Sequence, residues 1–149
     1  MEEGRIAVTG IGVYSPVGNG RKELWNSLKE GVSGAGKITG FDAEGFKSQV
    51  AAEVKGFVPV EHLSKKRARR MARFSQLASS AALQAVADAG LEMQDLDPFR
   101  IGTVIGTAAG DYENLEEQHR NLLEKGPGYG HPLAVPMIIP NMSSANVAI

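Results

Sequence analysis

The sequence predicts an α/β fold in which helices cover a mixed sheet. Two short apolar runs, residues 5–9 and 101–105, each end at a glycine. Both runs are apolar on both faces, as are strands that lie buried between layers of helices. Each run leads through small residues toward a helical segment, and this order of strand and helix is typical of α/β domains.

The first part of the chain predicts one helix and two edge strands. Residues 21–30 are expected to be helical, because their apolar side chains share one face and Gly31 supplies a C-terminal stop. Residues 38–42 and 49–55 are expected to be edge strands. In the second of these segments apolar and polar residues alternate, as in a half-buried strand.

The longest predicted helix runs from about Ser64 to Ala89. Ser64 is a good N-cap, and Gly90 suits the position that follows the last helical residue. One side of this helix is rich in alanine and is expected to be buried. Its residues are Met71, Phe74, Ala78, Ala81, Ala82, Ala85 and Ala89.

Two further helices are predicted in the last third of the chain. Asp111 is expected to cap one that extends to Lys125, and residues 126–136 form a Gly/Pro-rich loop. Asn141 is expected to cap another that continues to Ile149 without a stop signal. Residues 1–149 are therefore expected to be a truncated N-terminal portion of a domain. The helix that Asp111 caps has an apolar stripe formed by Tyr112, Leu115, His119 and Leu122.

The composition is that of an ordinary globular domain. The 149 residues are 42% hydrophobic and 22% charged, and the net charge of −1 creates no global field for nucleic acid or a membrane. No apolar run approaches the ~20 residues of a membrane helix, and the N-terminus lacks the regions of a signal peptide. The chain has no cysteine, which excludes disulfides and favours a cytoplasmic location.

Neither a nucleotide site nor a metal site is predicted, so no cofactor is expected. Gly10 and Gly12 begin a dinucleotide-like pattern, but Ser15 and Pro16 stand where the pattern needs a third glycine and a helix start. Tight turns at the end of a strand are the simpler interpretation. Structural or solvated roles are expected for the histidines, which lack metal-ligand spacing. They are His62, His119 and His131.

The strongest local signal is a run of six cations in nine residues. On one continuous helix, four of them would share a face. Residues 64–87 contain no Asp or Glu, whereas merely solvated faces usually mix signs. An anionic partner is predicted, either an acidic protein or nucleic acid, and a solvated face is the alternative. No aromatic residues interleave the cations to stack on bases. The cations are Lys65, Lys66, Arg67, Arg69, Arg70 and Arg73.

Small residues follow the second predicted strand, at 107–110. At the carboxyl end of a strand, such residues leave room for a ligand. Tight packing of a helix on the sheet explains them equally well.

Six segments, taken in order, resemble the type II β-ketoacyl-acyl carrier protein synthases, which are condensing enzymes with a thiolase-type fold. Residues 65–74 (KKRARRMARF) resemble the family's RKE-x-RRMDRF segment, and residues 135–142 (VPMIIPNM) resemble its VPMMIPNM segment. The resemblance implies an incomplete N-terminal half of that α/β fold. The other four segments are residues 8–20, 41–42, 87–91 and 101–107.

The resemblance implies a parent enzyme of fatty acid biosynthesis. Such an enzyme elongates acyl chains by decarboxylative Claisen condensation with malonyl carrier protein. In the family a cysteine takes the acyl chain, and two histidines and a lysine assist. These residues are expected beyond Ile149, so no catalytic residue is assigned and the chain alone is expected to be inactive. The alternative is a non-condensing partner, or chain-length-determining subunit, of a type II polyketide-like system.

The resemblance also implies a docking surface for the acidic acyl carrier protein. The family docks this partner on cations that match Lys66, Arg69 and Arg70, and Lys65 and Arg67 flank them. Neither nucleic acid nor a membrane is expected as a partner.

Two further sites are implied. Ala109, with Ala108 beside it, matches an acyl-pocket position that is often Ile in the family. Met137 and Ile138 match residues at the homodimer interface that wall the partner's acyl tunnel. The turn here reads TAAGD instead of GSGIGG, and Ala72 replaces the usual Asp. These departures leave acyl-chain preference open.

Overall fold

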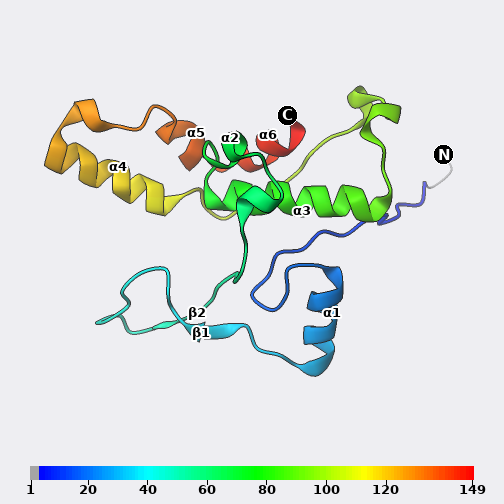
Figure 1. Cartoon of the computed structure of the whole chain (residues 1–149), viewed down its shortest axis with the longest axis horizontal. Helices are drawn as coiled ribbons and strands as arrows, with labels where there is room; N and C mark the ends of the chain where they lie inside the picture. The colour runs from blue at the N-terminus through cyan, green and yellow to red at the C-terminus, as the bar shows by residue number, and fades with distance from the viewer. Residues whose placement is uncertain (1–3) are drawn as a thin grey trace. The chain divides into compact units, whose positions relative to one another are not determined.

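A computed structural model describes residues 4–149 (Figure 1). These residues divide into two compact units. The first unit runs to Val58 and includes Leu83–Leu91. The second comprises Pro59–Ala82 and Glu92–Ile149. The long helix α3 (Arg73–Ala89) therefore contributes residues to both units.

In the first unit, α1 (Arg21–Glu30) has the predicted bounds. Gly31 ends it at φ 67°, a left-handed conformation that glycine adopts without a Cβ clash. The amide of Gly31 donates to the carbonyl of Leu28 at 3.3 Å, and so satisfies one of the last free carbonyls of the helix.

The sheet of the first unit is a two-stranded antiparallel ribbon. β1 (Ala35–Lys37) pairs with β2 (Val50–Ala52), so the strand predicted at 49–55 is confirmed in part. The strand predicted at 38–42 is wrong in position, because β1 ends before it. Glu53 instead accepts hydrogen bonds from two amides and a hydroxyl of that segment, and these bonds hold the pKa of its carboxyl below the ordinary value of 4.5.

The two apolar runs predicted as buried strands are not strands in this structure. Among residues 4–149, neither 5–9 nor 101–105 has a ladder partner. A strand exists only with a hydrogen-bonded neighbour. Ile6 is 99% exposed and Val104 is 98% exposed. The described residues therefore do not supply the surface that these apolar side chains are suited to cover.

The residues that follow the first run bind the last turns of α3. The amide of Ile11 donates to Asp88 Oδ2 at 3.0 Å, and Arg21 forms an ion pair with Asp88 Oδ1 at 3.0 Å. A Cβ at Gly10 would overlap the carbonyl oxygen of Ala85. The glycine pattern therefore permits close packing against a helix, rather than a turn at the end of a sheet.

The single helix predicted over residues 64–89 is in fact two helices. α2 (Lys65–Ala68) is followed by a non-helical connection at 69–72, and α3 begins after it. Ser64 caps α2 as predicted, since its hydroxyl accepts a backbone amide at 3.2 Å. Gly90 follows α3 at φ 64°, also as predicted.

The break between α2 and α3 has a side-chain cause. Gln76 Nε2 donates to the carbonyls of Ala68 at 2.9 Å and Met71 at 3.1 Å. In a continuous helix these carbonyls would accept amides four residues further on. Met71 and Ala72 turn inward and are only 4% and 3% exposed. The break thus buries two residues while the amide of Gln76 replaces the lost backbone bonds.

The core of the second unit lies at this break. Leu63, Ala68 and Met71 form a cluster of buried apolar residues. The alanine-rich face predicted for the long helix is confirmed as buried only at Met71, because its other members stay half-buried. The fully buried residues of α3 are instead Ser75, Ser79 and Ser80.

Three helices follow in the second unit: α4 (Tyr112–Lys125), α5 (Ala134–Ile138) and α6 (Met142–Ala148). Asp111 caps α4 as predicted, since its carboxylate accepts a backbone amide at 3.1 Å. α5 lies partly in the predicted loop, and Pro136 falls in its first turn, where no amide is needed. The predicted cap by the side chain of Asn141 is not formed.

The buried face of α4 is polar, which contradicts the predicted apolar stripe. Tyr112 and Leu122 are exposed, whereas Asn114 is buried and Gln118 is half-buried. The side chain of Gln118 accepts the amide of His131 at 2.7 Å. The segment that returns along α4 (Figure 1) therefore presents a backbone donor, which a glutamine satisfies and a leucine cannot.

Short 3₁₀ helices complete the chain, and no described helix is both long enough and apolar enough to span a bilayer. They are η1 (Pro59–Glu61), η2 (Met93–Asp95), η3 (Pro98–Arg100) and η4 (Pro127–Tyr129).

Candidate functional site

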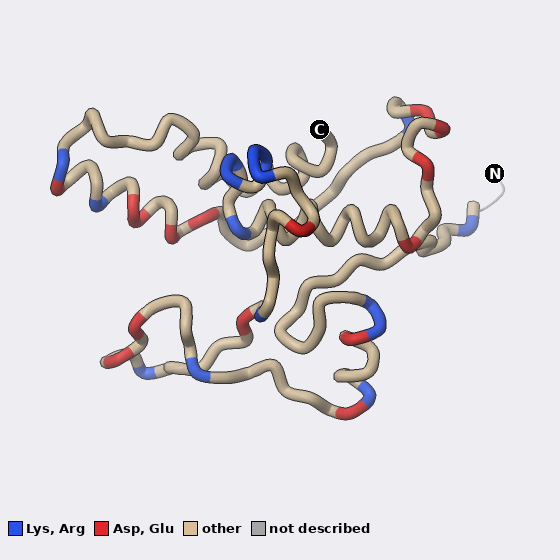
Figure 2. Tube along the Cα trace, in the orientation of Figure 1, with Lys and Arg blue, Asp and Glu red and all other residues tan. Residues whose placement is uncertain are grey.

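The basic segment, defined as residues 65–73, comprises α2, the connection at 69–72 and the first residue of α3. Figure 2 shows its cations gathered around α2. All six of its Lys and Arg side chains are exposed. The burial of Ala68, Met71 and Ala72 between them directs the charged residues outward. Because the apolar residues of the segment are buried, the surface that it exposes carries only positive charge.

The geometry of this surface differs from the prediction. Lys66, Arg69, Arg70 and Arg73 were expected on one face of a single helix. Because the helix breaks at 69–72, these four residues are divided between α2, the connection and the first residue of α3. The cations still lie within one short segment, but a 100° helical spacing does not describe their positions.

Arg67 has a role different from that of its neighbours. Its guanidinium donates to the carbonyl of Asn146 at 2.7 Å. That carbonyl lies in the last turn of α6, where a cation interacts favourably with the negative end of the helix dipole. Arg67 therefore holds α6, and its charge is already partly satisfied within the chain.

Four of the cations are available to a partner. Among residues 4–149, the side chains of Lys65, Lys66, Arg69 and Arg70 have no ion pair and no hydrogen bond. Neighbouring like charges destabilise a helix by a few tenths of a kcal/mol per pair. An anion bound here would relieve that repulsion and add attraction, so the segment is suited to an acidic surface.

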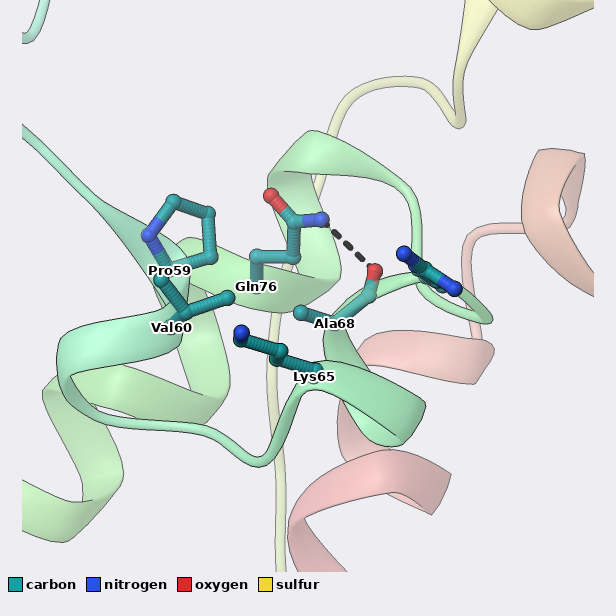
Figure 3. A pocket seen from close by; sticks show the side chains of 6 residues that line it. Pro59, Val60, Lys65, Ala68 and Gln76 are labelled. Atoms are coloured by element: carbon teal, nitrogen blue, oxygen red, sulfur yellow. Dashed lines mark hydrogen bonds between the residues drawn. The ribbon is translucent and has the colours of Figure 1, made fainter.

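A pocket of about 420 Å³ opens beside the basic segment (Figure 3). η1 supplies one wall, α2 the floor, and the first turns of α3 the other side. Neither Val60 nor Gln76 belongs to a sequence motif or a periodic pattern, so neither was predicted as a site residue. The six lining residues are Pro59, Val60, Lys65, Ala68, Arg69 and Gln76.

The second unit also brings together two sites that the sequence assigned separately. The amide of Asp111 donates to the carbonyl of Ile138 at 3.3 Å, and a Cβ at Gly110 would overlap that same carbonyl oxygen. The turn that contains Ala108 and Ala109 therefore packs directly against the end of α5. Met137 and Ile138 are half-buried there.

The hydroxyl of Thr107 donates to the carbonyl of Ala109 at 2.6 Å, which closes the turn. Ala109 is half-buried and Ala108 is exposed. Glycine at position 110 is thus explained by close approach of two backbones. Within the described part of the chain, no three His, Cys, Asp or Glu side chains are grouped to hold a metal.

Comparison with known proteins identifies the family. The family model described as "Beta-ketoacyl synthase, N-terminal domain" matches residues 3–149. The 3-oxoacyl-[acyl-carrier-protein] synthase 2 of Staphylococcus aureus (strain N315) is 43% identical over 145 residues, which is 97% of this chain and 35% of the relative. The chain thus spans about a third of the length of the curated relatives that it matches.

Solved structures show the same fold. The ishigamide ketosynthase/chain length factor superposes with a TM-score of 0.78 at 34% identity, over 95% of this chain and 35% of that one. A type II PKS acyl-carrier protein complex with its ketosynthase, bound to the hexaketide, gives a TM-score of 0.80 over 95% of this chain and 38% of that one. At 19% identity, this second likeness shows the fold alone.

These neighbours confirm the thiolase-like α/β fold that the resemblance implied, although residues 5–9 and 101–105 do not form strands here. The family model covers all but the first two residues. The chain therefore belongs to the β-ketoacyl synthase family and corresponds to its N-terminal domain.

Proposed function

We propose that this chain is the N-terminal part of a cytoplasmic β-ketoacyl-acyl carrier protein synthase. The whole enzyme elongates acyl chains by decarboxylative Claisen condensation with malonyl carrier protein, in fatty acid biosynthesis. The role of residues 1–149 in this enzyme is to dock the carrier protein and to shape part of the acyl pocket. Family membership over residues 3–149 supports the reaction class.

The observation that carries the docking assignment is the set of exposed, unpaired cations Lys66, Arg69 and Arg70. An acidic carrier protein meets a surface here that has no acid in residues 64–87 to compete for its carboxylates. One fold neighbour is a ketosynthase solved in complex with its acyl-carrier protein. Charges at such a rim act mainly on the rate of encounter and on its salt dependence.

The docking assignment is tested by reversing three charges in the full-length enzyme. Single exposed ion pairs contribute only about 0.2–1 kcal/mol each, so the change Lys66→Glu, Arg69→Glu and Arg70→Glu is made together. KM for the acyl carrier protein is expected to rise at least tenfold, while turnover of small thioester analogues stays near normal. Arg67 is left unchanged, because its loss would release α6.

A matched control carries the same change in net charge elsewhere. Lys22, Lys29 and Lys47 are exposed cations of the first unit, and all lie outside the basic segment. Their joint replacement by Glu should leave KM for the carrier protein nearly unchanged. Equal effects of the two triple variants, or a parallel loss of carrier-protein and small-thioester activity, would contradict the docking assignment.

We also assign the acyl pocket and the dimer contact to the turn and to α5. Ala108 and Ala109 form part of the pocket, and Met137 and Ile138 reach the acyl tunnel of the second subunit in a homodimer. The direct packing of the turn against Ile138 supports this assignment, because one backbone contact positions both. Sedimentation of the full-length enzyme as a monomer would contradict the dimer.

A second candidate is a non-condensing partner that determines chain length. The likeness to the ishigamide ketosynthase/chain length factor, at 34% identity, favours it. The two candidates differ in whether the full-length protein has a reactive cysteine. Labelling by a radioactive acyl carrier protein distinguishes them, since the condensing enzyme forms a thioester adduct and a chain-length subunit forms none.

A further inference from the structure

The pocket beside the basic segment combines apolar walls with two cations. Pro59 and Val60 of η1 form one wall, and Ala68 forms the floor (Figure 3). Lys65 and Arg69 complete the lining, and no carboxylate lines the pocket. Glu61, although part of η1, is not among the lining residues. The pocket is therefore suited to an apolar group with negative charge beside it.

The pocket is held in shape before any partner binds. Gln76 donates to the carbonyls of Ala68 and Met71, which joins the floor to α3. The amide of Leu63 donates to the carbonyl of Pro59 at 2.8 Å, which closes η1 over the buried side chain of Leu63. Preformed walls lower the entropic cost of binding.

The exposed part of the pocket is apolar surface that none of residues 4–149 covers. Val60 is 50% exposed, although valine is well suited to burial. Burial of this side chain on docking would stabilise a complex by removing apolar area from water. Apolar anchors that fill pockets contribute most of the affinity in many protein interfaces, whereas rim charges contribute less.

We infer that this pocket receives an apolar side chain of the acyl carrier protein, while carboxylates beside it pair with Lys65 and Arg69. The inference rests on the proposed function and names the contact that fixes the docked position. Charge complementarity selects this occupant. Lys66 and Arg70 extend the positive surface beyond the reach of one carboxylate, so a protein surface with several acids fits better than a single fatty acid.

The test measures binding of purified holo acyl carrier protein to the full-length enzyme by surface plasmon resonance. Val60→Ser removes the apolar wall, and Val58→Ser is the matched control, since Val58 is 42% exposed and does not line the pocket. Val60→Ser should raise Kd about five- to tenfold, because two methyl groups lose their burial. The increase should lie in the dissociation rate, and the slope of affinity against salt should not change.

A double-mutant cycle locates the occupant on the carrier protein. Exposed apolar residues of its acidic face are replaced by Ser one at a time, and one of these changes should lose its effect in the Val60→Ser enzyme. Circular dichroism checks that each variant is folded. Absence of any coupled residue would overturn the inference even if Val60→Ser weakens binding.

The outcomes separate this inference from the proposed function. If Val60→Ser and Val58→Ser bind equally while the triple Glu variant loses binding, the docking surface stands and the pocket assignment is wrong. If octanoate competes with the carrier protein for the native enzyme but not for Val60→Ser, the pocket is a fatty-acid site and the inference is wrong. If the native enzyme does not bind the carrier protein, both fail.

Discussion

At the scale of one residue, a single hydrogen bond gives Arg67 a role that differs from those of the other cations in residues 65–73. In the sequence it is one of six equivalent cations. In the structure its guanidinium binds the last turn of α6, while Lys66 and Arg70 remain exposed without a partner among the described residues. Its expected place in the docking set is therefore secondary, because a bond to a carrier carboxylate would compete with the bond to α6.

Ala109 carries the prediction that belongs to the residue scale. If its turn lines the acyl pocket, Ala109→Ile in the full-length enzyme adds three carbons to the pocket wall. Each buried methylene contributes about 0.8 kcal/mol, so the longest substrates should lose more than tenfold in kcat/KM and short ones should lose little. Steady-state kinetics over a series of acyl chain lengths measures this. An equal loss at every length would place the turn outside the pocket.

The break between α2 and α3 is the decisive feature at the scale of elements. Periodicity predicted one helix, and every residue of 65–89 is compatible with one. Two inward-facing residues and the amide of Gln76 instead produce a short helix, a connection and a long helix. This arrangement forms the floor of the pocket and exposes the cations, so the break belongs to the surface that we propose for docking.

Gln76→Ala tests the break. The substitution removes the side-chain donor of the Met71 carbonyl and leaves the Ala68 carbonyl with only the backbone amide of Met71, at 3.3 Å, at a cost of about 1–3 kcal/mol. The full-length enzyme should unfold at lower denaturant and bind the carrier protein more weakly. Gln94→Ala is the control, since Gln94 is exposed and its side chain donates to the nearby Glu92 carboxylate at a long 3.4 Å. Equal unfolding midpoints would show that Gln76 does not hold the break.

At the scale of the whole molecule, the chain exposes apolar surface that its own described residues do not cover. Ile6 and Val104 are almost fully exposed, and the apolar stripe of α4 faces outward. The chain spans about 35% of the length of its curated relatives. We propose that the remainder of the enzyme and its second subunit cover these surfaces, because exposed apolar patches of this kind otherwise promote association.

The isolated 149-residue chain therefore has two expected properties. It contains no cysteine, so incubation with radioactive acyl carrier protein should leave no covalent label. It should also associate as concentration rises, which sedimentation velocity measures. A stable acyl adduct would contradict the first expectation, and a monomer with a melting temperature above ~65 °C would contradict the second.

The helices that the sequence predicted correctly are those with local signals. α1 and α4 have the expected bounds, because Gly31 and Asp111 act within one turn of the helix that they end or begin. The basic segment was also found without the structure, since charge is visible residue by residue. Pro59 and Val60 were not predicted as site residues, because they line the pocket only where η1 lies beside α2 and α3.

The sequence by itself determined the family, the one-signed charge of residues 65–73, the caps and the apolar runs, since each is a property of neighbours along the chain. Only the tertiary structure decided that Gln76 breaks the long helix, that Arg67 binds α6 and that α4 buries its polar face. Each of these outcomes depends on a hydrogen bond between a side chain of a helix and a backbone group outside that helix. Periodicity cannot reveal such partners, because it records only which residues share a face.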